Sequence, residues 1–310
     1  MTEPTEQRRT WRPGRPVPIA AIWGTHRRGP SDPTYRRVDD LHVRGLRTPE
    51  GVATLAVEQV RDGVEARAWG PGAAWALDRV PRMLGDDDDP SGFAPHHPFV
   101  AEALRCHEHW RVGASDAVME SLVPAIIEQK VTGQEAFRGF RNLVRRFGER
   151  APGPAAATYD VWVQPDPATI RLVPSWEWLR LPVDPARSRT TLRACQVAPA
   201  LERTLGLAED EADARLRSLP GIGVWTSAET RFRAHGHADA LSVGDYHVAA
   251  NVGWALTGEL WTDEQMVAEL EVYRPHRYRV QRLVELAGAH RPRRGPRMAP
   301  RRHLPGSSRA

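Results

Sequence analysis

The stretch from Leu216 to Val248 constrains the fold more than any other part of the chain. It reads LRSLPGIGVWTSAETRFRAHGHADALSVGDYHV, with two glycines around one aliphatic residue between two helical patterns. Glycine adopts positive φ without steric cost, so Gly221-Ile222-Gly223 predicts a tight hairpin between two short helices. The first N–H groups of the second helix lack an intrahelical acceptor, which suits an anion such as a phosphate.

Some twenty residues after the hairpin, Gly244-Asp245-Tyr246-His247-Val248 places a carboxylate at an expected helix start. Together the two segments resemble the hairpin and the catalytic loop of the helix-hairpin-helix (HhH-GPD) DNA glycosylases, in particular the 3-methyladenine glycosylase II branch. The hairpin positions that match are Leu216, Leu219, Pro220, Gly221, Ile222, Gly223 and Thr226. Asp245 matches the catalytic aspartate. The alternative is a helix–turn–helix held by glycine for packing, with Asp245 as an ordinary N-cap.

The resemblance implies a DNA-binding surface around the hairpin. The backbone of Gly221, Ile222 and Gly223, with Thr226, would hold a DNA phosphate. Residues 127–132 resemble the helix end from which the family inserts a side chain into the gap left by a flipped base. Gln129 and Lys130, the only lysine of the chain, occupy this wedge position. Lys130 could instead be a solvated cation that complements the helix dipole.

A reaction mechanism follows from the same resemblance. The base must leave the duplex stack before an enzyme can act on it. Breaking the N-glycosidic bond creates positive charge on the sugar, and the Asp245 carboxylate about 4 Å away would contribute on the order of 4 kcal/mol. Bifunctional relatives carry a lysine two residues after the second hairpin glycine, where this chain has Trp225. A monofunctional glycosylase is therefore expected; the alternatives are a lyase that uses Lys130 and a non-catalytic DNA-binding protein.

The identity of the excised base is less constrained than the reaction. Trp225 and Tyr246 are candidates for the base pocket, because an aromatic face attracts a cationic alkylated base. Glu229 and His290 stand where the nearest branch has aromatic pocket residues, which leaves the preferred base open. Arg277 belongs to a Pro-x-Arg element of the family, and it would contact a phosphate or form a buried ion pair.

Composition and pattern give the domain organisation. The chain has 310 residues, 41% of them hydrophobic, and a net charge of +4. This size and composition predict two domains with a sizeable core. The resemblance implies a mainly α, two-lobed HhH-GPD fold, with a small antiparallel α+β domain at residues 1–97 and a helical domain at 98–290 whose hairpin lies at 216–232. Residues 291–310 are basic and lack apolar periodicity, which predicts a disordered tail. Within the first domain, residues 1–12 are expected to be frayed, and segments 18–23, 41–46, 52–57 and 64–69 are expected to be strands.

The remaining expectations concern cofactors and surroundings. Two cysteines without a CxxC motif exclude a zinc finger or a four-cysteine cluster within this chain. The run Asp86–Asp89 lacks the spacing of a calcium loop and predicts a solvated connection between domains. No cofactor or metal is expected, although hairpin carbonyls are compatible with a monovalent cation. With no membrane segment visible, we expect a cytoplasmic, nucleoid-associated monomer whose partner is double-stranded DNA with a damaged base.

Overall fold

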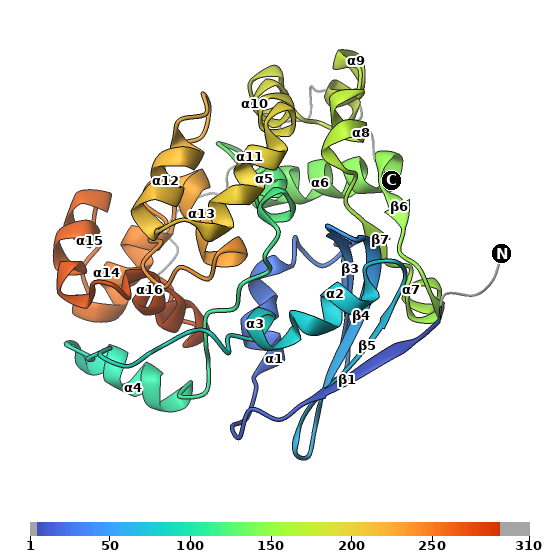
Figure 1. Cartoon of the computed structure of the whole chain (residues 1–310). Helices are drawn as coiled ribbons and strands as arrows, with labels where there is room; N and C mark the ends of the chain where they lie inside the picture. Colours follow the sequence, from blue (N-terminus) through green and yellow to red (C-terminus); the bar gives the residue numbers. More distant parts are fainter. Residues whose placement is uncertain (1–4, 292–310) are drawn as a thin grey trace.

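The computed structural model describes residues 5–291 of the chain. It is mainly helical, with one small antiparallel sheet beside the helices (Figure 1), as predicted. The predicted basic tail lies outside the described residues except for Arg291. Among residues 5–291, no helix is long and apolar enough to cross a membrane.

The sheet has five antiparallel strands in the order β1-β5-β4-β3-β2. Their bounds are β1 Gln7–Trp11, β2 Tyr35–Val38, β3 Leu41–Thr48, β4 Gly51–Val60 and β5 Gly63–Trp69. The predictions for segments 41–46, 52–57 and 64–69 are confirmed. Two others are wrong: residues 7–11 are ordered as the edge strand β1 because they pair with β5, and residues 19–23 form the helix α1 (Ile19–Trp23).

Both faces of the sheet are covered. On one face, Leu55 and Val57 pack with α1, α2 (Ala73–Asp78) and α3 (Val80–Met83). On the other, Val43 and Ala56 pack with α7 (Pro154–Tyr159) and the ribbon of β6 (Glu149–Arg150) and β7 (Trp162–Val163). Because the first face also reaches Phe232 and Tyr278 of the helical part, sheet and helices share one core.

The helices form two lobes around separate apolar clusters. The first contains α5 (Val118–Ile127), α6 (Gly133–Phe147), α8 (Pro167–Arg171), α9 (Ser175–Arg180), α10 (Pro185–Gln196) and α11 (Ala198–Glu202). The second contains α4 (Pro98–Cys106), α14 (Val248–Thr257), α15 (Asp263–Glu269) and α16 (Arg277–Leu286). The hairpin helices α12 (Glu209–Arg217) and α13 (Val224–Ala234) complete the set, and α13 packs against α5 at the centre of the molecule (Figure 1).

The segment between α5 and α6 corrects one helix prediction. The apolar pattern over residues 116–134 predicts a helix that kinks at Pro124 or begins just before it, but α5 begins at Val118 and ends at Ile127. Lys130 then has a left-handed backbone, with φ of +54°. Thr132 and Glu135 form a reciprocal capping box that starts α6. The predicted wedge residues therefore lie in an exposed turn between two helices.

The acidic run Asp86–Asp89 is less solvated than predicted. Asp88 forms a buried ion pair with Arg279, at 2.6 Å between Oδ1 and Nη2, and accepts a hydrogen bond from the Val112 amide. Asp89 accepts two hydrogen bonds from Ser91. The ion pair between Asp88 and Arg279 therefore holds this segment against α16. No cluster of three or more potential metal-ligand side chains occurs within residues 5–291.

Candidate active site

The hairpin has the predicted geometry. Gly221 is exposed and has φ of +99°, while Ile222 between the two glycines is only 6% exposed and packs in the first lobe. A Cβ on Gly221 would come within 2.3 Å of Thr190 Oγ1. Gly223 is exposed, extended and directly precedes α13. The glycines therefore present uncovered backbone at a helix N-terminus while the isoleucine anchors the turn.

The hairpin is tied to the turn after α5. The Gln129 Nε2 amide donates to the Gly221 carbonyl at 2.9 Å and to Thr226 Oγ1 at 2.8 Å. Thr226 is 2% exposed, so its hydroxyl serves this internal bond. Lys130 is exposed and, among the described residues, has no hydrogen bond or ion pair. Of the two predicted wedge residues, Lys130 is the one whose side chain is available.

Asp245 lies beside Trp225, the residue at the family's lysine position. Its Oδ2 accepts a hydrogen bond from Trp225 Nε1 at 3.1 Å. Its Oδ1 accepts from the amides of His247 at 2.8 Å and Val248 at 3.2 Å, at the start of α14. Asp245 therefore has the contacts of an N-cap and is also half-exposed, so the two interpretations of this residue are compatible. Three donors fix the orientation of the carboxylate.

The other predicted pocket residues lie in different environments. Tyr246 is 78% exposed, with its ring edge-on to His247 and the Arg291 guanidinium 5.9 Å from its centroid. His290 is exposed near the end of the described chain. Trp225 is half-buried against Asp245. Of the three, Trp225 contacts Asp245 and Tyr246 follows it directly in the chain.

Glu229, a predicted base-pocket residue, is buried and paired inside the protein. It is 8% exposed, because its position on α13 faces the interior of the molecule. Its Oε2 pairs with Arg233 Nη1 at 2.6 Å, and its Oε1 accepts a hydrogen bond from Ser242 Oγ at 2.7 Å. Both carboxylate oxygens are thus used inside the protein. Nothing in the local sequence indicated Ser242 as the partner.

Arg277 forms the buried ion pair that was one of its two predicted roles. Its Nε donates to Asp239 Oδ1 at 2.9 Å, and its side chain is 14% exposed. The Arg277 backbone amide also donates to Asp239 Oδ1. The guanidinium is therefore engaged at the start of α16, which argues against a role in contacting DNA phosphates.

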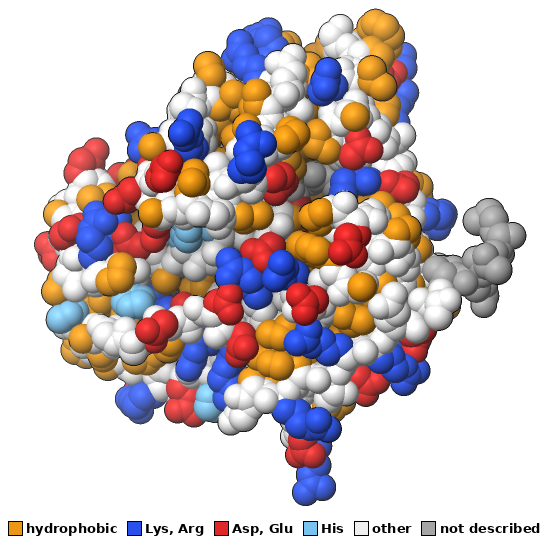
Figure 2. Space-filling view, viewed as in Figure 1, with side chains coloured by type: hydrophobic (Ala, Val, Ile, Leu, Met, Phe, Trp, Pro, Cys, Tyr) orange, Lys and Arg blue, Asp and Glu red, His pale blue; other side chains and the backbone are white. Residues whose placement is uncertain are grey.

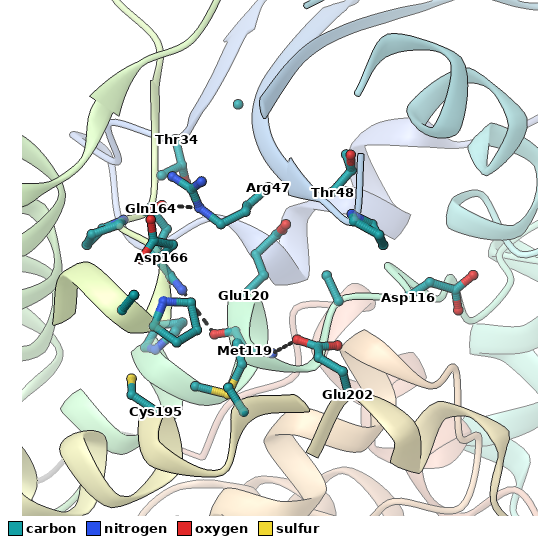
Figure 3. A pocket seen from close by; sticks show the side chains of 18 of the residues that line it. Thr34, Arg47, Thr48, Asp116, Met119, Glu120, Gln164, Asp166, Cys195 and Glu202 are labelled. Atoms are coloured by element: carbon teal, nitrogen blue, oxygen red, sulfur yellow. Dashed lines mark hydrogen bonds between the residues drawn. The ribbon is translucent and has the colours of Figure 1, made fainter. Parts of the chain in front are cut away.

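A separate cavity of about 880 Å³ lies at the other end of α5 (Figure 3). Glu120 and Met119 of α5 face it, with Thr34 and Arg47 from the sheet side and Cys195 and Glu202 from α10 and α11. Burial raises the pKa of Glu120, which pairs with Arg44, and raises that of Cys195 to about 12. None of the predicted site residues lines this cavity.

The surface charge is mixed on the face shown in Figure 2, where positive and negative side chains are interspersed. A single-sign field that could guide a polyanion is not apparent there.

Comparison with known proteins identifies the fold. No model of a protein family matches the sequence, and no curated protein matches it. The solved structure of a 3-methyladenine DNA glycosylase from Archaeoglobus fulgidus superposes with a TM-score of 0.71 at 17% identity, covering 90% of this chain and 97% of that one. An 8-oxoguanine glycosylase/lyase from Clostridium acetobutylicum, in complex with DNA, gives 0.66 at 11% identity, covering 92% and 97%. The chain has the helix-hairpin-helix DNA glycosylase fold.

Proposed function

We propose that the protein is a monofunctional DNA glycosylase that removes a damaged base by hydrolysis of its N-glycosidic bond. The observation that carries this proposal is the Asp245 carboxylate, held by Trp225 Nε1 and two amides at the start of α14, in a chain with a glycosylase fold. A protein that only binds DNA has no use for an oriented carboxylate, which repels phosphate.

In this mechanism the hairpin holds the backbone of a damaged duplex while Lys130 fills the gap left by the flipped base. The Asp245 carboxylate then faces the sugar and stabilises the positive charge that develops as the bond breaks. It also orients the attacking water. The products are a free base and an abasic site. The protein acts as a monomer on chromosomal DNA and needs no cofactor; a monovalent cation on the hairpin carbonyls is compatible with this mechanism.

The proposed substrate is an alkylated base. Such a base carries positive charge and leaves without a strong general acid, and Asp245 is the one carboxylate that we place at the reacting sugar. The similarity in fold to a 3-methyladenine glycosylase supports this class, while similarity to an 8-oxoguanine enzyme keeps oxidised purines as the competing class. A base-release assay on methylated DNA, with mass identification of each liberated base, tests the proposal; release of no base would favour the DNA-binding alternative.

The lyase alternative needs an amine nucleophile, and Trp225 occupies the place of the family's lysine. Lys130 supplies the chain's only side-chain amine, and it lies in the exposed turn. Borohydride trapping on an abasic duplex should give no covalent adduct with the wild-type protein. An adduct that disappears in Lys130→Ala would establish the bifunctional mechanism instead.

A further inference from the structure

We propose that a buried polar network, made of Arg28, Glu128, Arg233, Glu229, Ser242 and Gln281, positions the Asp245 loop relative to the turn that carries Lys130. The proposal rests on the proposed function, because it takes Asp245 as the catalytic group. It assigns Glu229 and Ser242 as positioning residues. It also gives the N-terminal part of the chain a role in the active site.

The network begins beneath the Lys130 turn. Glu128 directly precedes Gln129 and Lys130, and both of its carboxylate oxygens accept from Arg28 Nη1 at 3.0 Å. The Arg28 side chain is 5% exposed and that of Glu128 is 15% exposed. The Arg28 amide in turn donates to Asp32 Oδ2 at 2.6 Å. A loop of the N-terminal part therefore holds the base of the turn.

Arg233 joins this end of the network to α13. Its Nε donates to the Thr25 carbonyl at 2.7 Å, and its Nη1 pairs with Glu229 at 2.6 Å. Burial raises the pKa of Glu128, and the charges of Arg28 and Arg233 act against that rise. Glu128 and Glu229 in turn favour the charged form of Arg233. The four charges alternate in sign across the interface between the N-terminal loop, α5 and α13.

The other end of the network holds the catalytic loop. Ser242 Oγ donates to Glu229 Oε1 at 2.7 Å, and the Ser242 amide donates to Gln281 Oε1 at 3.1 Å. Ser242 is fully buried, and its carbonyl accepts from the Asp245 amide at 3.3 Å. A displacement of Glu229 would therefore be passed to the residue that sets the backbone of Asp245.

Such a network can favour one relative position of the segments that it connects. Buried charges are costly to desolvate and tolerate few alternative pairings, so a network of them favours one relative placement of the segments that it joins. Catalysis is sensitive to this placement, because a misplacement of 1 Å can slow a reaction about 100-fold. The polar network joins the two segments that must act on the same nucleotide.

The test compares Glu229→Gln and Ser242→Ala with a matched control. The control, Glu120→Gln, also breaks a buried ion pair of α5, that with Arg44, and Glu120 has no hydrogen bond or ion pair with any of the six network residues. Under single-turnover conditions we expect Glu229→Gln and Ser242→Ala to release base about 10- to 100-fold more slowly than the wild type. Their affinity for an abasic-site duplex should stay within about threefold, and Glu120→Gln should stay within threefold in both assays.

Hydrogen exchange on the free protein provides a readout that does not require catalysis. Amides of residues 242–248 should exchange faster in both network variants and at the wild-type rate in Glu120→Gln. Unchanged exchange, or faster exchange with an unchanged rate of base release, would overturn the positioning role. So would equal slowing of base release in the control. If the wild type itself releases no base, the proposed function fails, and faster exchange would leave only the structural connection supported.

Discussion

The contact between Trp225 and Asp245 decides how the candidate site differs from that of a lyase. A lysine at position 225 would offer a nucleophile, whereas the indole offers one N–H donor and a flat apolar face. In this structure the donor is directed at the Asp245 carboxylate. In the sequence, Trp225 is notable only because it replaces the family's lysine. In the structure, its indole N–H orients the Asp245 carboxylate.

Asp245→Asn tests the carboxylate itself. The amide is nearly isosteric, so folding and binding to an abasic-site duplex should persist. The lost charge is worth about 4 kcal/mol, so we expect base release to slow by about 1,000-fold under single-turnover conditions. Release at the wild-type rate would contradict the mechanism.

Trp225→Phe isolates the hydrogen bond. Phenylalanine keeps an apolar ring but cannot donate to Asp245 Oδ2, so we expect base release about 10-fold slower with little change in DNA affinity. Trp254→Phe on α14 is a suitable control, since Trp254 is partly exposed and its indole N–H has no hydrogen bond among the described residues. If both variants behaved alike, the loss would reflect the smaller ring rather than the donor.

At the scale of elements, only one of the two hairpin glycines adopts a backbone conformation that requires glycine. Gly221 has a positive φ and no room for a Cβ beside Thr190, whereas Gly223 has a negative φ and nothing within 4 Å of an added Cβ. The two positions look equivalent in the sequence LPGIG. Because only Gly221 needs a glycine, Gly223 can serve as the control position for a substitution at Gly221.

Gly221→Ala should lower the free energy of unfolding by about 2 kcal/mol, the sum of left-handed backbone strain and the contact with Thr190. It should also weaken DNA binding. Gly223→Ala should change stability by less than about 1 kcal/mol. Urea unfolding and duplex affinity, measured for both variants, check this; similar losses at the two glycines would show that the backbone geometry is not the cause.

The helix around Pro124 shows how far sequence can predict the elements. The apolar spacing predicts a helix that covers α5 but extends it to residue 134, whereas the resemblance places Lys130 after the helix end, where the structure has it. The break itself is not predicted, although Thr132 and Glu135 have the spacing of a capping box, as do Thr262 and Gln265 at the start of α15. By contrast, the bonds from Gln129 to Gly221 and Thr226 span more than 90 residues, and no local pattern encodes them.

On the scale of the whole molecule, the sheet and the helices share a core, which explains the errors at the N-terminus. Residues 7–11 have no apolar alternation, and their strand is defined by pairing with β5, some 55 residues later. Residues 19–23 are apolar in a pattern that suits either a strand or a short helix. The burial of Glu229 could not be predicted for the same reason, since the direction of its side chain depends on how α13 packs against the N-terminal loop.

The buried histidine His42 predicts that the free energy of unfolding falls as the pH is lowered. Burial lowers the pKa of His42 to about 4, and His42 is 2% exposed beside Tyr35. The unfolded chain takes up a proton below pH 6.5 that the folded chain does not, so this histidine destabilises the protein as the pH falls from 6.5 towards 4. At pH 5 the effect is about 2 kcal/mol.

His42→Asn keeps an acceptor for Tyr35 and removes the titration. The difference in unfolding free energy between wild type and variant should therefore shift by about 2 kcal/mol in favour of the variant between pH 7 and pH 5. Urea unfolding at the two pH values measures it. A constant difference would mean that His42 is protonated in the folded protein.

The arginines after Arg291 should contribute to DNA affinity but not to catalysis. Residues 292–310 contain six arginines, and Arg291, the last described residue, lies beside Tyr246 near Asp245. Each phosphate neutralised by a cation steepens the salt dependence of binding by about 0.9. Deletion of residues 292–310 should therefore weaken duplex binding at low salt and flatten the plot of log affinity against log salt by up to about five. The single-turnover rate of base release from the saturated complex should not change; a slower rate would mean that this segment acts on the bound nucleotide.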